Sequence, residues 1–131
     1  MIVVDTSVWV DFFRGRNTPQ VEFFVHAVES DAELALTDVV LTEVLQGVVS
    51  DQEADRVERR LSAFELLRLD SVDDFRSAAA LYRQARRAGF TVRRTLDCLI
   101  AAVCLRERAP LLHADADFDR LAECTPLRTV M

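Results

Sequence analysis

Short apolar runs alternate with helical patterns along the whole chain, and this alternation constrains the fold more than any other feature of the sequence. Each run is bounded by polar residues, as buried parallel strands usually are. We expect strands at Ile2–Val4, Leu34–Leu36, Leu66–Leu69, Pro110–His113 and Pro126–Met131. Parallel strands need crossover connections, which are usually helices. The alternation therefore predicts an α/β sandwich with a parallel sheet.

The segments between the expected strands carry signals for helix starts. Thr6 and Ser7 offer capping hydroxyls to the first helix. Ser50 with Glu53 forms a capping-box pattern before the fourth. Apolar residues recur at steps of three and four in most of these segments, whereas Leu96–Leu105 is almost wholly apolar and should run through the middle of the domain. The expected helices span about residues 8–13, 17–28, 38–46, 51–64, 72–88, 96–105 and 118–122.

The length of 131 residues suits a single domain, because two separate cores would each be marginal at this size. Hydrophobic residues make up 50% of the chain, so enough apolar surface is present to stabilise one core. The first residues lack the basic segment and the longer apolar run of a signal peptide, and no stretch suits a membrane span. We therefore expect one domain over residues 1–131 in the cytoplasm, with Cys98, Cys104 and Cys124 reduced.

The charge balance narrows the classes of function. The net charge is −6, which by itself argues against a nucleic-acid footprint. All 16 basic residues are arginine, however, and arginine suits forked recognition of phosphate. A receiver-type phosphorylation domain needs a lysine near the phosphoryl group, and this chain contains none. A haloacid-dehalogenase-like phosphatase needs a second aspartate two residues after the first, where this chain has Ser7 after Asp5. Both alternatives are weakened.

Acidic side chains stand where a parallel α/β fold would gather its functional groups. Asp5 follows the first expected strand, and Asp115 and Asp117 follow the fourth. In such folds, functional groups gather outside the carboxyl ends of the strands. Glu43 and Asp97 fall on helices rich in apolar residues, where an unpaired carboxylate is costly to bury. These carboxylates therefore need a stabilising partner.

A divalent cation is the simplest partner for the carboxylates. Carboxylate oxygens and water are the ligands that suit Mg²⁺ and Mn²⁺, and the two histidines, His26 and His113, form no cluster that would compete. A cation held in this way can lower the pKa of a bound water, align it with a phosphorus atom and stabilise the leaving oxygen. The pattern favours phosphodiester hydrolysis without a protein nucleophile.

Four segments carry the acidic residues in order along the chain. They are Met1–Trp9 with Met-Ile-Val-Val-Asp-Thr-Ser-Val-Trp, the helical Glu43, Arg93–Ala102 with Arg-Arg-Thr-Leu-Asp-Cys-Leu-Ile-Ala-Ala, and Leu111–Phe118 with Leu-Leu-His-Ala-Asp-Ala-Asp-Phe. Together these segments resemble the PIN-domain family, and in particular its VapC-type toxins. The four segments together are specific evidence for this family, although any one of them alone would be weak evidence. The resemblance runs from the first residue nearly to the last.

The resemblance implies a PIN-like three-layer α/β/α sandwich and a Mg²⁺-dependent endoribonuclease toxin, in which Mn²⁺ should also serve. It assigns catalysis to five carboxylates: Asp5, Glu43, Asp97, Asp115 and Asp117. It also implies that Thr6 or Ser7 supports Asp5. We expect the first three carboxylates and one of the last two to hold the metal, and we favour Asp115 over Asp117. The number of metal ions stays open.

The resemblance also implies a homodimer, a cognate VapB-type antitoxin whose C-terminal segment lies across the active-site groove, and an RNA substrate such as tRNA or rRNA. Arg93 and Arg94 either bind RNA phosphates or are solvated loop charges. One short helix carries three large aromatic residues, which is more than a single buried stripe needs: Trp9, Phe12 and Phe13. An exposed remainder would mark an antitoxin or dimer interface, and core packing alone is the alternative.

Ordinary structural roles stay open for each acidic residue. Asp5 could only cap the next helix, Glu43 could be a solvated helix residue, and Asp97 could be a first-turn acid favoured by the helix dipole. Asp115 and Asp117 could be turn residues. A catalytically inactive PIN-fold module that binds RNA or protein is therefore the alternative function, and activity on DNA is a further one.

Overall fold

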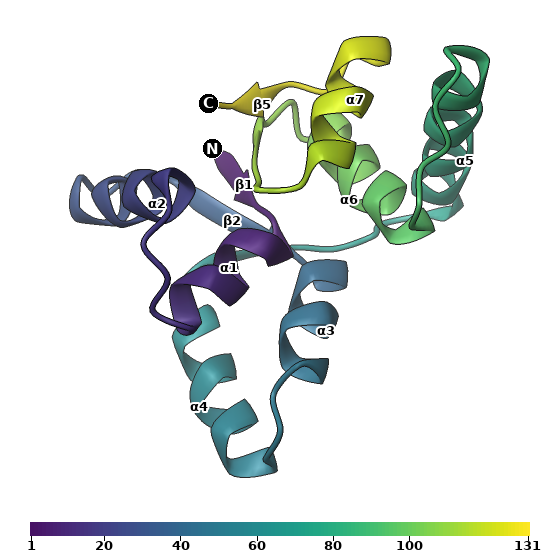
Figure 1. The fold of residues 1–131 in the computed structure, drawn as a ribbon. Helices are drawn as coiled ribbons and strands as arrows, with labels where there is room; N and C mark the ends of the chain where they lie inside the picture. The colour runs from purple at the N-terminus through teal and green to yellow at the C-terminus, as the bar shows by residue number, and fades with distance from the viewer.

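The apolar runs form five strands that pair in parallel throughout the sheet (Figure 1). The computed structural model describes residues 1–131. The strands are β1 (Ile2–Val4), β2 (Leu34–Thr37), β3 (Glu65–Leu67), β4 (Leu111–Leu112) and β5 (Thr129–Val130). Their order is β3-β2-β1-β4-β5, so β1 is central, and Val3 pairs with Ala35 on one side and with Leu111 on the other. The predicted parallel sheet is confirmed.

Seven helices cover the sheet in two groups. They are α1 (Thr6–Phe13), α2 (Pro19–Glu29), α3 (Asp38–Gln46), α4 (Asp51–Leu61), α5 (Val72–Arg87), α6 (Thr95–Arg106) and α7 (Ala116–Cys124). Figure 1 shows α1, α2 and α4 on one side of the central strands and α5, α6 and α7 on the other, and α3 packs against α1 and α4. The chain therefore has the expected three-layer α/β/α arrangement.

The core is one cluster of 31 buried hydrophobic residues. It takes Val3 and Val4 from the central strand, both without exposed surface, and the run Ile100–Cys104 from α6. The burial of this run explains why α6 is apolar almost all round, as the sequence predicted. Contacts of α6 with both α5 and α3 place it in the middle of the molecule. None of the helices combines the length and the apolar character that crossing a membrane requires.

Several element boundaries differ from those expected. The last helix begins at Ala116 and not at Phe118, because the Asp115 side chain caps it by accepting the Asp117 N–H. Helix α4 ends at Leu61, which leaves Phe64 in the turn before β3. The final strand is limited to Thr129–Val130. For α7 and β5, the structure adds or removes residues at one end of an element that the sequence placed correctly.

The expected caps of α1 were wrong. Thr6 and Ser7 are the first two helical residues, and the N-cap is Asp5, whose backbone is still extended as it leaves β1. Its carboxylate accepts the Ser7 N–H at 3.1 Å, which satisfies one of the free donors of the first turn. By contrast, Ser50 caps α4 as predicted, accepting the Glu53 N–H at 3.1 Å.

The topology collects helix starts at one edge of the sheet. Each of β1, β2 and β4 leads at its carboxyl end into a helix, which is α1, α3 and α7 respectively, after at most three residues. Because the strands are parallel, these three N-termini lie at the same edge. The contact between α6 and α3 brings a fourth helix to them. All five predicted carboxylates lie on these helices or cap them.

Candidate active site

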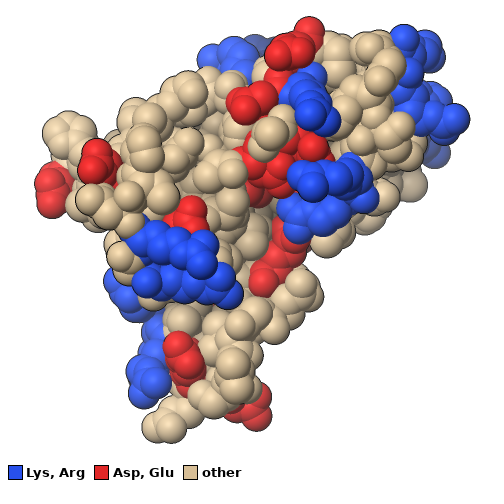
Figure 2. Space-filling model, in the orientation of Figure 1, with Lys and Arg blue, Asp and Glu red and all other residues tan.

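Acidic side chains from distant parts of the chain meet at this edge of the sheet. Carboxylate oxygens of Asp97, Asp115 and Asp117 all lie within 4.8 Å of one another. Figure 2 shows acidic side chains gathered in the middle of this face, with arginines directly beside them. Glu43 adjoins this group because Arg94 bonds both Glu43 and Asp97, and Asp5 adjoins it because Ser7 links Asp5 to the loop that precedes Asp115. The structure thus brings the predicted set together.

Asp5 is held by Ser7 through one of its two oxygens. Oδ2 accepts hydrogen bonds from the Ser7 backbone N–H at 3.1 Å and from the Ser7 hydroxyl at 2.6 Å. The same hydroxyl accepts the N–H of Ala114 at 3.0 Å, which ties the start of α1 to the loop after β4. Oδ1 is buried and has no hydrogen-bond partner. Burial raises the pKa of Asp5, and Glu43 raises it further, while the bonds from Ser7 act in the opposite direction.

Asp97 is the most enclosed of the five, with 0% of its surface exposed. Its Oδ1 accepts a hydrogen bond from Arg94 at 2.9 Å, while its Oδ2 is buried without a partner. Burial raises the pKa of Asp97 to about 7; Arg94 opposes this rise, and the charges of Asp5 and Asp115 add to it. A carboxylate placed this way is costly without a cation.

Glu43 lies on α3 and is also buried. Its Oε1 accepts a hydrogen bond from the Thr6 hydroxyl at 2.8 Å, and its Oε2 accepts one from Arg94 at 2.9 Å. The expectation that Thr6 or Ser7 supports Asp5 is therefore met by Ser7, whereas Thr6 orients Glu43. Adjacent residues serve different carboxylates because they project from different sides of α1.

Asp115 and Asp117 both lie in the acidic cluster, and which of them holds the metal stays a prediction. Asp117 is buried, and its Oδ2 accepts a hydrogen bond from Arg93 at 3.0 Å. Asp115 is more exposed and caps α7 while lying 3.5 Å from the same guanidinium. His113 accepts the Asp115 N–H through Nδ1 at 3.1 Å, so this histidine orders the loop and is not one of the clustered acids.

Arg93 and Arg94 form ion pairs with the clustered carboxylates. Arg93 pairs with Asp117, and Arg94 spans Glu43 and Asp97. Their side chains remain 72% and 47% exposed, so each guanidinium also faces solvent. The two arginines predicted to bind phosphate thus lie at the site, where their present partners are protein carboxylates.

The donors at this site fit a divalent cation. The atoms available are hard carboxylate oxygens, which Mg²⁺ and Mn²⁺ prefer. Two of them, Asp5 Oδ1 and Asp97 Oδ2, are buried without any partner, which native structures rarely tolerate. A bound cation would satisfy both and would also offset the burial that raises the pKa of the two aspartates.

The aromatic residues of α1 divide between core and surface. Trp9 is 1% exposed, donates its ring N–H to the Val4 carbonyl at 3.1 Å and packs edge-on against Phe24. The prediction that Trp9 could face a partner was therefore wrong, because its ring fills the space between α1 and α2. Phe12 and Phe13 are only partly buried, and the guanidinium of Arg60 lies about 5 Å from each ring.

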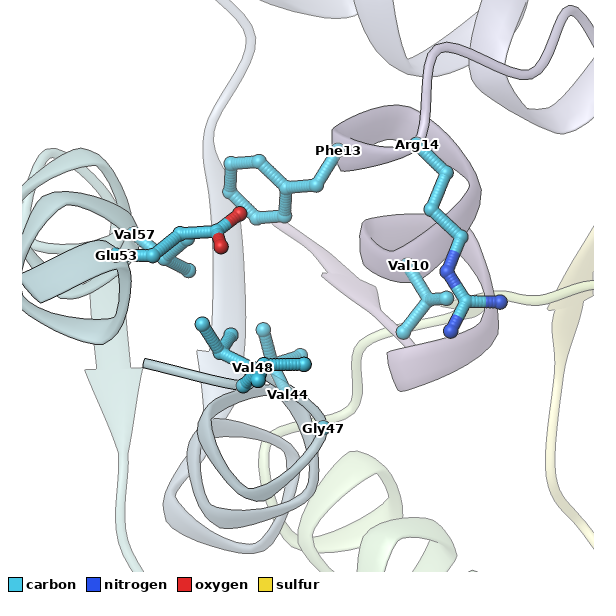
Figure 3. Close-up of a pocket in the computed structure, with 9 residues that line it drawn as sticks. Val10, Phe13, Arg14, Val44, Gly47, Val48, Glu53 and Val57 are labelled. Atoms are coloured by element: carbon cyan, nitrogen blue, oxygen red, sulfur yellow. The ribbon is translucent and has the colours of Figure 1, made fainter. Parts of the chain in front are cut away.

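An apolar groove that the sequence did not reveal lies between α1, α3 and α4. It has a volume of about 270 Å³ and is drawn in Figure 3. Phe13 is the one residue of the predicted interface that lines it, together with Val10, Arg14, Val44, Gly47, Val48, Val49, Glu53 and Val57. Val49 is 98% exposed. The adjacent pair Val48-Val49 in a loop was the available signal, since exposed apolar pairs often mark contacts.

Comparison with known proteins identifies the family of the chain. The PIN domain family model matches residues 2–123. Ribonuclease VapC11 of Mycobacterium tuberculosis and VapC ribonuclease Mb1587 of Mycobacterium bovis are each 42% identical to this chain over 129 residues, covering 98% of this chain and 96% of theirs. These matches include the segments that carry all five carboxylates.

Solved structures share the fold at lower sequence identity. VapBC2 from Rickettsia felis, bound to a DNA fragment from their promoter, has a TM-score of 0.78 and 18% identity, covering 99% of this chain and 98% of that one. VapC20 of Mycobacterium tuberculosis, a sarcin–ricin loop cleaving toxin, has a TM-score of 0.70 and 17% identity, covering 98% and 99%. Together with the family match and the 42% identical ribonucleases, they show that the chain belongs to the PIN-domain family, among the VapC ribonuclease toxins of VapBC systems.

Proposed function

We propose that the chain is a metal-dependent endoribonuclease that cleaves RNA phosphodiester bonds at the carboxylate cluster. The observation that carries the proposal is the pair of buried oxygens without partners, Asp5 Oδ1 and Asp97 Oδ2, beside the acids of α7. An inactive binding module would gain nothing from this arrangement, because clustered negative charge repels the phosphates of RNA unless a cation is present.

The chain's own residues divide the work of the site. Asp5, Asp97, Glu43, Asp115 and Asp117 would hold Mg²⁺ or Mn²⁺. When bound, the cation lowers the pKa of a water and stabilises negative charge on the scissile phosphate. Ser7 fixes Asp5 with its free oxygen turned away from the hydroxyl, and Thr6 fixes Glu43. The exposed edges of Arg93 and Arg94 are placed to position the RNA strand.

The direct test is an RNA cleavage assay with the purified protein. Cleavage should require Mg²⁺ or Mn²⁺ and stop on addition of EDTA. Asp5→Asn and Asp97→Asn should each abolish it while leaving the circular dichroism spectrum unchanged. Retained cleavage by Asp97→Asn in a contaminant-free preparation would remove the assignment. A parallel assay on single-stranded DNA separates ribonuclease from deoxyribonuclease activity, and end-mapping of cellular RNA identifies the substrate.

The substrate and the protein partners follow from the relatives. VapC20 is a toxin that cleaves the sarcin–ricin loop, which supports ribosomal RNA as one substrate class beside tRNA. The structural neighbours include VapBC complexes, which supports a VapB-type antitoxin as partner, and a homodimer stays an expectation from the family. Expression of the chain alone should arrest growth, and co-expression of the antitoxin encoded beside it should relieve the arrest.

We propose that the antitoxin binds in the apolar groove. Phe13, Val44 and Val57 line it at the contact of α1, α3 and α4, while Arg14 and Glu53 supply opposite charges among the same lining residues. A short amphipathic helix suits such a surface, since its apolar face fills the groove and its polar face meets the charges. Glu43 lies on the same helix as Val44, so a chain leaving the groove is close to the carboxylates.

A further inference from the structure

Arg94 occupies a helix cap without capping the helix. It is the N-cap residue of α6, yet its side chain makes no hydrogen bond to the first turn. Residues favoured at this position are Ser, Thr, Asp and Asn, whose short side chains reach the free N–H groups. Arginine cannot accept a hydrogen bond at all. The residue at this position therefore does something other than capping.

The guanidinium of Arg94 reaches carboxylates from three different helices. Nη1 donates to Glu43 Oε2 at 2.9 Å, and Nη2 donates to Asp97 Oδ1 at 2.9 Å. The same Nη2 lies 3.8 Å from Asp115 Oδ2. Glu43 belongs to α3, Asp97 to α6, and Asp115 caps α7. One positive charge thus balances three negative charges that come from three different helices.

This contact competes with a divalent ion for the same acids. A cation within the cluster would sit close to a guanidinium of the same sign, and two of the carboxylate oxygens it could use are already donor-bonded to Arg94. The Arg94 side chain is 47% exposed, and its backbone lies in the loop before α6. The side chain can therefore turn into solvent without disturbing the core. Asp97, by contrast, is fixed in the first turn of α6.

We propose that Arg94 is a resident counter-ion, which holds Glu43, Asp97 and Asp115 together in the metal-free protein and must leave their oxygens when a divalent cation binds. The inference rests on the proposed metal-dependent function and adds a cost to metal binding. The metal-free site stays assembled although its acids repel one another, and the affinity for the metal is lower than the carboxylates alone would give.

The test is a Mn²⁺ titration by calorimetry on the full chain. Arg94→Gln removes the counter-ion, and Arg76→Gln is the matched control, because it removes the same charge from an exposed pair with Asp73 on α5. We expect Arg94→Gln to bind Mn²⁺ about tenfold more tightly than wild type, and Arg76→Gln to match wild type. Equal or weaker Mn²⁺ binding by Arg94→Gln overturns the proposal, since it would make Arg94 a support for the ligands.

A second measurement needs no variant, in case Arg94→Gln does not fold. In wild-type protein, NMR reports how fast the guanidinium hydrogens of Arg94 exchange with water. Saturating Mg²⁺ should speed this exchange at Arg94 and leave Arg76 unchanged. Slow exchange at Arg94 in the Mg²⁺-saturated protein overturns the proposal.

The outcomes separate this inference from the proposed function. If wild type binds Mn²⁺ but Arg94→Gln binds it no better, only the role of Arg94 is lost. If neither protein binds Mn²⁺, the metal-dependent nuclease and the counter-ion both fail.

Discussion

The hydroxyl of Ser7 donates a hydrogen bond of 2.6 Å to Oδ2 of Asp5. The bond uses one oxygen of the aspartate and leaves the other, Oδ1, buried and free. Because the Ser7 hydroxyl also accepts the N–H of Ala114, its orientation is fixed from both sides. Ser7 therefore decides which oxygen of Asp5 is available to a ligand.

Ser7→Ala should weaken the metal site without unfolding the protein. Asp5 would keep its bond to the Ser7 backbone N–H but lose the hydroxyl, and the N–H of Ala114 would lose its acceptor. Removing a residue that orients a metal ligand typically lowers metal affinity or activity by about 10 to 100-fold. Mn²⁺ calorimetry and RNA cleavage rates measure the effect. Ser30→Ala, at the end of α2, is the control, and wild-type Mn²⁺ affinity in Ser7→Ala would refute the role.

The buried Asp97 should make the metal-free protein less stable as the pH rises. Burial raises the pKa of Asp97 to about 7 in the folded state, above its ordinary value of 3.8. Between these two values the folded protein holds a proton that the unfolded chain has released. The contribution of Asp97 to the free energy of unfolding is therefore fully present below about pH 4 and is lost as the pH rises to about 7. Each pKa unit is worth about 1.4 kcal/mol, so the loss is at most about 4 kcal/mol.

Asp97→Asn isolates this effect from the other carboxylates. Chemical denaturation in EDTA should show wild type losing stability relative to Asp97→Asn between pH 4 and pH 7, with no further relative change above pH 8. Saturating Mn²⁺ should remove the wild-type loss, since a bound cation stabilises the ionised form. Parallel pH profiles for the two proteins in EDTA would contradict the raised pKa.

Val49→Asp should impair antitoxin binding and spare catalysis. Val49 is almost fully exposed at the apolar groove, so the substitution leaves the core intact but places a charge where an apolar partner would pack. Dissociation of the VapB-type partner should be at least about tenfold faster, which is about 1.4 kcal/mol. Val72→Asp, at an exposed valine on α5, is the matched control. Equal effects of the two variants would place the antitoxin elsewhere.

Asp74→Ala should destabilise the fold without changing metal affinity. Asp74 is buried on α5, pairs with Arg106 of α6 and accepts the Asp70 N–H at 2.7 Å. Removing the carboxylate leaves the Asp70 N–H without its acceptor and breaks a charge-assisted bond to Arg106, which typically costs about 1.5 to 3 kcal/mol. Asp73→Ala breaks the exposed pair with Arg76 and should cost less than about 1 kcal/mol. Urea denaturation compares the two, and a similar small loss in both would contradict the buried role.

The sequence predicted the acids of the site better than their partners. Asp5 follows a β-branched run at a strand end, and Asp97 stands in an apolar helix; both local patterns indicate a buried acid. The pairing of Thr6 with Glu43, 37 residues away, depends on how α1 packs on α3. No local pattern carries that information, because either Thr6 or Ser7 could have faced Asp5.

The sequence could not show which aromatic residues of α1 are buried and which are exposed. Trp9 and Phe13 are four residues apart and lie on nearby faces of one helix, but Phe24 of α2 and Phe64 after α4 enclose Trp9, while Phe13 lines the groove. Which ring is covered depends on residues from other elements. The parallel pairing of the strands followed from the alternation of runs and helices, since that alternation allows few other connections.

The hydrogen bond from Ala114 to Ser7 spans 107 positions of the chain. Its donor and the acids Asp115 and Asp117 are synthesised long after Asp5. A chain that stops before β4 cannot complete the cluster. A nascent or truncated chain that lacks β4 and α7 should therefore lack the proposed nuclease activity, which should begin only once these elements have been made.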